Sequence, residues 1–139
     1  MTIKTDFISV DTKGHNDMID ITNQAGRKLQ ESGITAGTVT FFVSGSTAGL
    51  STVEYEPGLL KDIPAMFEKL APENARYHHN ETWHDGNGNS HVRATLLGPS
   101  LVVPFNDGEM MLGTWQQIVL IDFDNRSRHR RVVMQMMGE

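Results

Sequence analysis

Short apolar segments rich in β-branched and aromatic residues, separated by polar turns, most constrain how this chain folds. Such segments of about four to eight residues are typical of β-strands. Segments with helical spacing are fewer, so the sequence predicts an α+β fold with a largely antiparallel sheet. The predicted strands cover residues 3–9, 38–43, 101–105, 115–123 and 128–136.

Three- and four-residue spacing of apolar side chains predicts amphipathic helices in two segments. The first has Asn16 or Asp17 as its expected N-cap, and Gly33 follows its last turn. A third segment, just before a Gly-Pro pair, has the character of a short helix or an ordered turn. The predicted helical segments cover residues 17–31, 58–70 and 91–97.

Length and composition limit the possible classes of protein. With 139 residues, the chain is expected to form a single domain over residues 1–139. It has no cysteine, which excludes disulfides, thiolate metal sites and cysteine nucleophiles, and its net charge of -5 argues against nucleic-acid partners. No run approaches the roughly 20 apolar residues of a membrane helix. The N-terminus has no secretory pattern, so we expect a cytoplasmic protein with no membrane partner.

Histidines are concentrated in one part of the chain. The polar stretch 71–90, predicted to be a loop, and the residue after it contain His78, His79, His84 and His91. Neutral imidazoles are common ligands of zinc and other divalent metals, so these residues are candidate ligands. Their spacing matches no short metal motif, and a solvated polar loop is the alternative interpretation. In an extended chain neighbouring side chains point to opposite faces, so at most one of the adjacent pair would be a ligand.

A turn of small residues, Ser44–Gly49, follows the predicted strand that ends at Val43. Small residues let the backbone approach an anion closely, and hydroxyl and amide groups can donate to phosphate. An ordinary strand-ending turn is the simpler interpretation. Glu54 and Glu56 follow soon after, and they either complete a cation site or lie in solvent.

Arginines are concentrated near the C-terminus. On a strand, Arg126, Arg128 and Arg130 would share one face, and Arg131 would point to the other. Guanidinium groups match the geometry of phosphate and carboxylate groups. A charged strand edge that discourages aggregation is the alternative.

Several segments, in the same order and spacing, are similar to the motifs of one family. Together they resemble the YjbQ family, also called the secondary thiamine-phosphate synthase family, from about Val39 to Glu139. The matching segments are Phe42–Leu50, Tyr77-x-His79, Asn89–Ala94, Leu97–Ser100, Leu112–Ile118 and Asp122–Asp124.

The resemblance implies a small α+β domain with two to three helices that forms a homotrimer, with sheets packed around a threefold axis. It also implies a weak thiamine-phosphate synthase activity. This transferase joins a pyrimidine diphosphate to a thiazole phosphate and needs a divalent metal, zinc or magnesium, near the departing diphosphate. The partner would then be a small phosphorylated metabolite. The alternatives are a non-enzymatic metal- or anion-binding trimer and a metal-dependent phosphoester hydrolase.

The resemblance also implies roles for particular residues. The catalytic residues would be His79, His91 and Glu54. A metal would be held by His79, His84 and His91. The phosphate-binding residues would be Ser46, Thr47, Arg93, Arg126 and Arg128. The pocket would be lined by Trp115 and Gln116.

One position departs from the family pattern. The first family motif carries a histidine in a His-Thr-Thr-Ala-Gly sequence, and this chain has Gly45 in that place. The resemblance therefore implies one metal ligand fewer; either His84 replaces it, or the site binds metal weakly or not at all.

Overall fold

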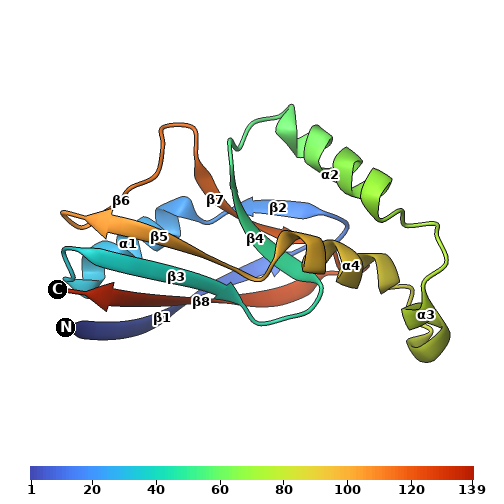
Figure 1. Cartoon of the computed structure of the whole chain (residues 1–139), viewed down its shortest axis with the longest axis horizontal. Coiled ribbons are helices and arrows are strands. Elements are labelled where there is room, and N and C mark those ends of the chain that lie inside the picture. Colours follow the sequence, from blue (N-terminus) through green and yellow to red (C-terminus); the bar gives the residue numbers. More distant parts are fainter.

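The computed structural model describes all 139 residues, which form two antiparallel sheets and four helices (Figure 1). The strands are β1 (Thr2–Thr12), β2 (Asp17–Asp20), β3 (Gly37–Val43), β4 (Ala48–Val53), β5 (Ser100–Asn106), β6 (Glu109–Met110), β7 (Gln117–Asp122) and β8 (Arg128–Gly138). The helices are α1 (Thr22–Ser32), α2 (Leu59–Leu70), α3 (His78–Trp83) and α4 (Gly88–Leu97). The five-stranded sheet has the order β1-β8-β3-β5-β6, and the three-stranded sheet has the order β2-β7-β4.

The predicted α+β class with antiparallel sheets is confirmed. All five predicted strands are present as β1, β3, β5, β7 and β8. The predicted second helix is present as α2, and the segment predicted as a short helix or turn belongs to α4. The fold has four helices, whereas two to three were expected, and no helix has the length and apolar character needed to span a bilayer.

The start of the first predicted helix is wrong. Residues 17–20 form β2, which pairs with β7 in the register Asp17↔Asp122, and α1 begins only at Thr22. Residues 17–20 form hydrogen bonds with β7 instead of a helical turn. Helix propensity is a weak preference, and strand pairing in the folded protein overrides it. The helix ends as expected, since Gly33 has the left-handed φ of 75°.

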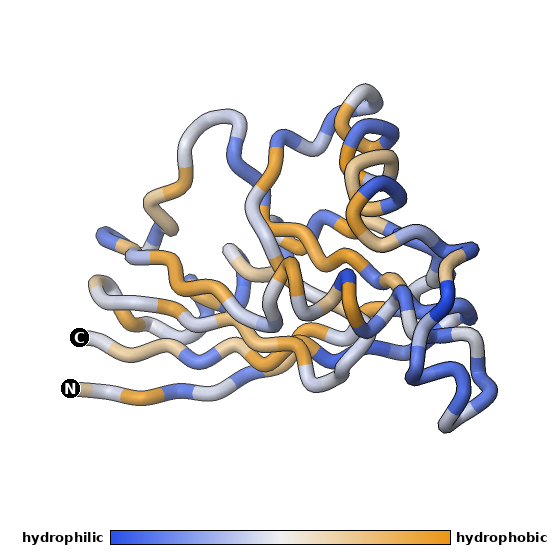
Figure 2. Tube along the Cα trace, turned by 45° about the vertical axis from the view of Figure 1, so that its right-hand side comes forward, coloured by the Kyte–Doolittle hydropathy of each residue, from blue (hydrophilic) through white to orange (hydrophobic).

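The polar stretch 71–90 is not a continuous loop. Residues 78–83 form the single-turn helix α3, and α4 begins at Gly88, three residues before its predicted start. The stretch is strongly hydrophilic and lies at the edge of the domain (Figure 2). Its helices carry almost no apolar stripe, so hydrophobic periodicity could not reveal them.

The main core lies between the sheets and α1. It contains 18 buried residues, among them Phe41, Leu120 and Met134 from three strands and Leu29 from α1. A second, smaller cluster joins α2 and α4 to β7, and in it the rings of Phe67 and Phe123 meet edge to face at 4.8 Å. This second cluster holds α4 against the sheet at the end where β7 finishes.

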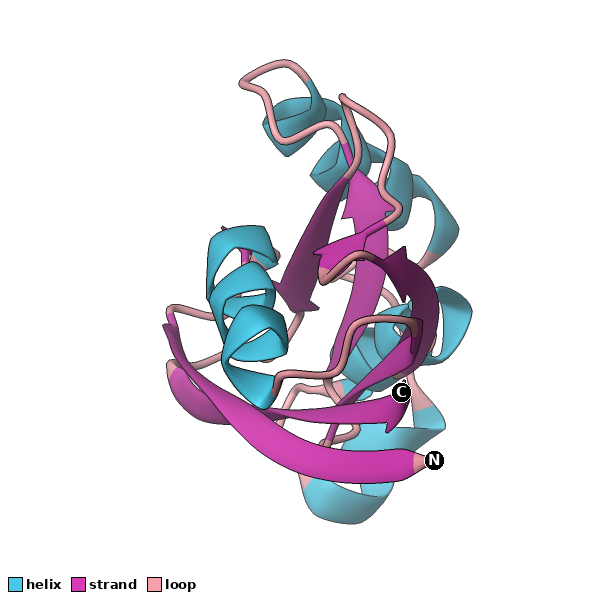
Figure 3. Cartoon of the chain, turned by 90° about the vertical axis from the view of Figure 1, so that its left-hand side faces the viewer, coloured by secondary structure: helices cyan, strands magenta, loops and turns pink.

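The helices occupy opposite ends of the sheets. Helix α1 lies near the end that carries both termini, whereas α2, α3 and α4 lie at the other end (Figures 1 and 3). The β3–β4 connection and the start of β8 also lie at this second end (Figure 1). Four distant parts of the chain therefore meet at this end of the molecule.

Candidate functional site

Two histidines and one aspartate form a compact cluster on α3, α4 and the segment that joins them. The candidate ligand atoms of His79, Asp85 and His91 all lie within 4.8 Å of one another. Nε2 of His79 is 3.1 Å from Oδ1 of Asp85, and the two imidazole rings are 4.3 Å apart, tilted by 48°. The donor set of two imidazoles and one carboxylate is suited to a divalent transition metal.

Close packing at the start of α4 brings these side chains together. A Cβ on Gly88 would lie 2.3 Å from Cβ of Tyr77, so only glycine lets the start of α4 approach the residue before α3. Oδ1 of Asn80, in α3, accepts a hydrogen bond of 2.9 Å from N–H of Gly88. These contacts fix α3 against α4 and place the ring of His79 beside the ring of His91.

The charge states around the cluster favour metal binding. Burial lowers the pKa of His91 below 6.5, and the neighbouring His79 lowers it further, whereas Asp85, Asp124 and the backbone of Ser46 oppose the shift. The hydrogen bond from N–H of Asn87 and the neighbouring His79 outweigh burial and lower the pKa of Asp85. Near pH 7 the cluster thus offers a neutral imidazole and a carboxylate, the forms that bind a metal.

Beneath the cluster lies a network of buried, paired charges. Asp122 and Asp124, both 0% exposed, lie at the end of β7 and just after it. Asp122 accepts two hydrogen bonds from the guanidinium of Arg130, at 2.7 and 2.9 Å. Asp124 accepts hydrogen bonds from Nε of Arg128, at 3.0 Å, and from the hydroxyl of Thr47, at 2.8 Å, and Nη2 of Arg128 forms a salt bridge with it at 2.9 Å.

Asn87 connects the histidine cluster to this network. Its backbone N–H donates to Oδ1 of Asp85, and its side-chain amide donates to Oδ1 of Asp124. Its side-chain oxygen accepts from N–H of Asn125, just after Asp124 in the chain. The metal-ligand candidates therefore rest on a rigid polar base.

The structure brings some of the predicted phosphate-binding residues close to this base and places one elsewhere. Ser46 and Thr47 lie in the β3–β4 turn, and Arg128 is bound to Asp124. The exposed Arg126 contributes its backbone N–H to Asp124. Arg93, on α4, is 3% exposed and donates to Ala71, Asn16 and Glu68, so its guanidinium is committed to protein acceptors.

The predicted residues Glu54, Trp115 and Gln116 lie away from the histidine cluster. In the β4–β7 pairing, Ala48 faces Asp122, whereas Val53 faces Gln117 at the opposite end. A strand rises about 3.3 Å per residue, so Glu54 is separated from Thr47 by roughly 20 Å. Trp115 is 72% exposed, Gln116 donates to Thr52 at that same far end, and Glu56 caps α2 through N–H of Leu59.

His84 does not take part in the cluster. It ends α3 in a left-handed conformation with φ of 57°, and its side chain is exposed. His78 is also turned outward, 91% exposed, beside Glu81. The carboxylate of Asp85, next to His84 in the chain, occupies the third position.

Four important residues were not among the predicted site residues: Asp85, Asp122, Asp124 and Arg130. Asp122 and Asp124 are two apart on or beside a strand, as Arg128 and Arg130 are, so each pair shares a face. That matched spacing is the signal from which the ion-pair network could have been inferred. For Asp85 the sequence contains no signal beyond its closeness to the histidines.

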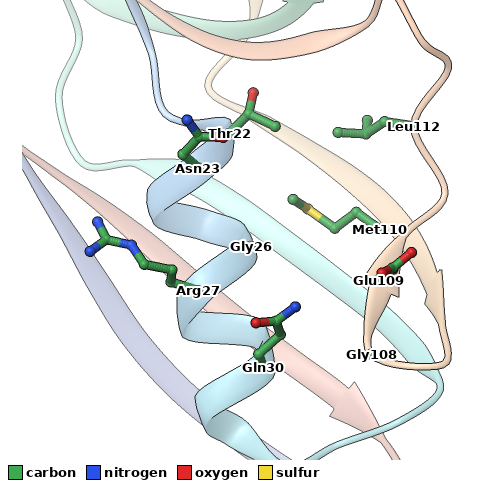
Figure 4. Close-up of a pocket in the computed structure, with 9 residues that line it drawn as sticks. All are labelled: Thr22, Asn23, Gly26, Arg27, Gln30, Gly108, Glu109, Met110 and Leu112. Atoms are coloured by element: carbon green, nitrogen blue, oxygen red, sulfur yellow. The ribbon is translucent and has the colours of Figure 1, made fainter.

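A groove of about 500 Å³ lies at the opposite end of the molecule (Figure 4). It runs between α1 and the β5–β6 hairpin, with Arg27 and Gln30 on one side and Glu109 and Met110 on the other. Its lining includes no histidine, and it has no contact with the cluster described above.

Comparison of sequences relates the chain to one family. Residues 6–139 match the family described as UPF0047 protein YjbQ-like. A UPF0047 protein of Methanothermobacter thermautotrophicus is 38% identical over 139 residues, which cover 100% of this chain and 95% of that protein. The UPF0047 protein YugU of Bacillus subtilis is 33% identical, over 94% of this chain and 97% of that protein.

Solved structures show the same architecture. A YbjQ-like protein of unknown function from Sulfolobus solfataricus superposes with a TM-score of 0.89 and 31% identity, over 99% of this chain and 100% of that chain. An uncharacterised YjbQ/UPF0047 protein from Clostridium acetobutylicum superposes with a TM-score of 0.85 and 32% identity, over 94% and 98% of the two chains.

These comparisons correct the expected activity. The related proteins are described as UPF0047 proteins, uncharacterised or of unknown function, and none carries the name of a thiamine-phosphate synthase. The prediction of a thiamine-phosphate-synthase-like transferase is therefore wrong.

Proposed function

We propose that this chain, which belongs to the family of UPF0047, YjbQ-like proteins, is a metal-binding protein. One divalent ion would be held by His79, Asp85 and His91. The observation that carries the proposal is the convergence of these three ligand atoms within 4.8 Å. Ligand atoms about 2.0–2.2 Å from one tetrahedral ion are themselves about 3.3–3.6 Å apart. The separation of 3.1 Å between His79 and Asp85 is close to that value.

The donor set narrows the identity of the metal. Magnesium prefers oxygen ligands in octahedral geometry, whereas two imidazoles favour zinc and other first-row transition metals. Of the two metals expected from the sequence, zinc therefore fits this cluster better.

Three protein ligands leave at least one coordination position open. The cluster is only partly buried, with 27% of the His79 side chain and 41% of the Asp85 side chain exposed, so solvent reaches it. An open position on zinc holds water and lowers its pKa toward neutrality, which is the chemistry of a hydrolytic site. The cluster is therefore suited to activating water or binding an anionic ligand, and not only to stabilising the fold.

We also propose that the chain assembles as a homotrimer, as the family resemblance implies. Support comes from exposed apolar side chains on β5 and on the segment after β6: Val102 is 59% exposed and Met111 is 66% exposed. Both line a recess with Leu101 and Pro104. Large apolar patches of this kind mark surfaces that bind another protein.

Zinc titration tests the metal site. In isothermal titration calorimetry, we expect the metal-free chain to bind one zinc ion and His91→Ala to lose at least about tenfold in affinity. His78→Ala is the matched control, because His78 is adjacent to His79 but points into solvent. Equal zinc affinity for His91→Ala and wild type would refute the proposal.

A further inference from the structure

The turn between β3 and β4, residues 44–47, contains hydrogen-bond donors that have no acceptor within the protein. The backbone N–H groups of Gly45, Ser46 and Thr47 donate to neither backbone nor side-chain oxygens, and the Ser46 hydroxyl also has no partner. Consecutive free N–H groups in a turn form a concavity that attracts anions. This segment is called the β3–β4 turn below.

Beneath the turn, Arg130 has one free end. Its side chain is only 9% exposed, and its Nε and Nη2 atoms donate to Asp122 and Thr47. Its Nη1 atom donates to no protein atom. Because every fully buried side-chain nitrogen or oxygen in the chain has a hydrogen-bond partner, Nη1 is accessible from solvent. Nη1 is thus the open end of a buried, immobilised guanidinium.

Gly45 is the reason that this end is open. A Cβ at position 45 would lie 2.7 Å from Nη1 of Arg130, and the only other atom within 4 Å is Cζ of the same arginine, at 3.7 Å. A side chain at position 45 would therefore project toward the guanidinium of Arg130, the only group near it. Any other residue at this position would cover Nη1.

The surrounding charges leave room for an anion. The carboxylates of Asp122 and Asp124 are matched by the guanidinium groups of Arg130 and Arg128. Each carboxylate also accepts a threonine hydroxyl, from Thr12 and Thr47, respectively. The carboxylates nearest to the turn are therefore already paired with cations, which reduces their repulsion of an anion.

We propose that the β3–β4 turn and Nη1 of Arg130 bind a phosphate group, either free phosphate or that of a small phosphomonoester. A tetrahedral oxyanion has enough oxygens to accept from the free N–H groups, the Ser46 hydroxyl and Nη1 at once, and bonds to a guanidinium are among the strongest. None of the donors of this site is a proposed metal ligand, although the backbone of Ser46 forms a hydrogen bond with the imidazole of His91. The site lies at the same end of the molecule as α4, which carries His91 (Figure 1).

Phosphate titration of the metal-free full-length chain tests this site. In isothermal titration calorimetry, inorganic phosphate and glycerol 3-phosphate serve as probes. Gly45→Ala, which places a methyl group against Nη1, is expected to weaken binding by about tenfold or more, as the loss of a charge-assisted hydrogen bond would. Ser46→Ala removes one neutral donor and is expected to weaken it by about threefold.

Gly26→Ala is the matched control, because a Cβ at Gly26 meets no atom within 4 Å. It should bind phosphate as wild type does, and melting temperatures should show that all variants are folded. Tighter binding of glycerol 3-phosphate than of phosphate identifies a phosphomonoester as the ligand, and equal binding identifies the phosphate group alone; both support the site.

Two results would overturn the proposal: no phosphate binding by the wild type, or equal binding by wild type and Gly45→Ala. His79→Ala separates this site from the metal site. It should retain phosphate binding while losing zinc, so either site can fail without the other.

Discussion

Asp122 and Asp124 are buried charges whose stability depends on two arginines of β8. Arg130 binds Asp122 through two hydrogen bonds, and Arg128 binds Asp124 through one hydrogen bond and a salt bridge. Removing one member of such a pair leaves the other charge buried without compensation, which costs far more than the pair contributes. These four residues therefore form the base of the site, and Nη1 of Arg130 is left without a protein acceptor.

Asp124→Asn should destabilise the fold. The change leaves the guanidinium of Arg128 without its carboxylate, and we expect the free energy of unfolding at pH 7 to fall by about 3 kcal/mol. Urea unfolding followed by circular dichroism measures this difference. Glu109→Gln, at an exposed strand end, is the control and should change stability by less than about 0.5 kcal/mol. A change equal to that of the control would show that the pair does not stabilise the fold.

The lowered pKa of Asp124 makes the stability of the fold depend on pH. Burial alone would raise the pKa of Asp124, but hydrogen bonds from Thr47, Asn87 and Arg128 outweigh it and lower the pKa below 3.8. A carboxyl with a lowered folded-state pKa stabilises the fold above its unfolded value and loses that effect as the pH falls through the folded value. Below about pH 4, wild type should therefore lose stability more steeply than Asp124→Asn. Unfolding curves with equal slopes in acid would contradict this assignment.

At the level of single residues, the sequence predicted part of the candidate site. The clustering of histidines drew attention to His79 and His91, and the fold brings these two side chains together. Asp85 was missed because acidic residues are common on surfaces, and only the fold shows which one faces a histidine. The role of Arg130 depends on the absent side chain of Gly45, a relation between residues 85 positions apart that no local pattern contains.

Helices α3 and α4 determine the geometry of the metal cluster, although neither has a strong apolar face. Gly88 lies against Tyr77 at a distance that no larger residue tolerates. N–H of Gly88 is also bonded to Asn80. One contact point therefore controls the separation of the two histidines.

Gly88→Ala should weaken metal binding from outside the cluster. The added methyl group would displace Tyr77 and α3, so His79 and His91 would move apart, and zinc affinity should fall by about 10- to 100-fold. Gly26→Ala is the control: it should leave zinc affinity unchanged and raise stability by up to about 1 kcal/mol, as expected within a helix. Calorimetric titration with zinc measures both. Unchanged zinc affinity in Gly88→Ala would show that this contact does not position the cluster.

The strands were predicted more successfully than the polar elements. Strands β3, β5 and β8 alternate in burial along much of their length, and that alternation is visible in the sequence. In contrast, β2 is four residues long, and its strand conformation is imposed by pairing with β7. Helix α3 was missed because a single polar turn has no periodicity to detect.

Across the whole molecule, distance in the sequence was a poor guide to distance in space. Ser46 and Glu54 are eight positions apart, but β4 separates them by most of its length. Thr47 and Asp124, by contrast, are 77 positions apart and share a hydrogen bond. The antiparallel pairing of β4 with β7 explains both facts, because it aligns the start of one strand with the end of the other.

The proposed trimer gives a prediction for the whole molecule. Size-exclusion chromatography with light scattering should give a mass three times the 15.5 kDa of one chain. Val102→Glu, which places a charge on the exposed apolar surface of β5, should shift the protein toward monomer without unfolding it. Lys69→Glu, an exposed change on α2, should leave the mass unaltered. A monomeric wild type would contradict the proposal.

The proposed metal site of His79, Asp85 and His91 would be visible in the anomalous difference density of a crystal of the zinc-loaded protein. We predict one strong peak at about 2.0–2.2 Å from a nitrogen of each histidine and from an oxygen of Asp85. Zinc bound elsewhere on the chain, with no peak at this cluster, would contradict the account.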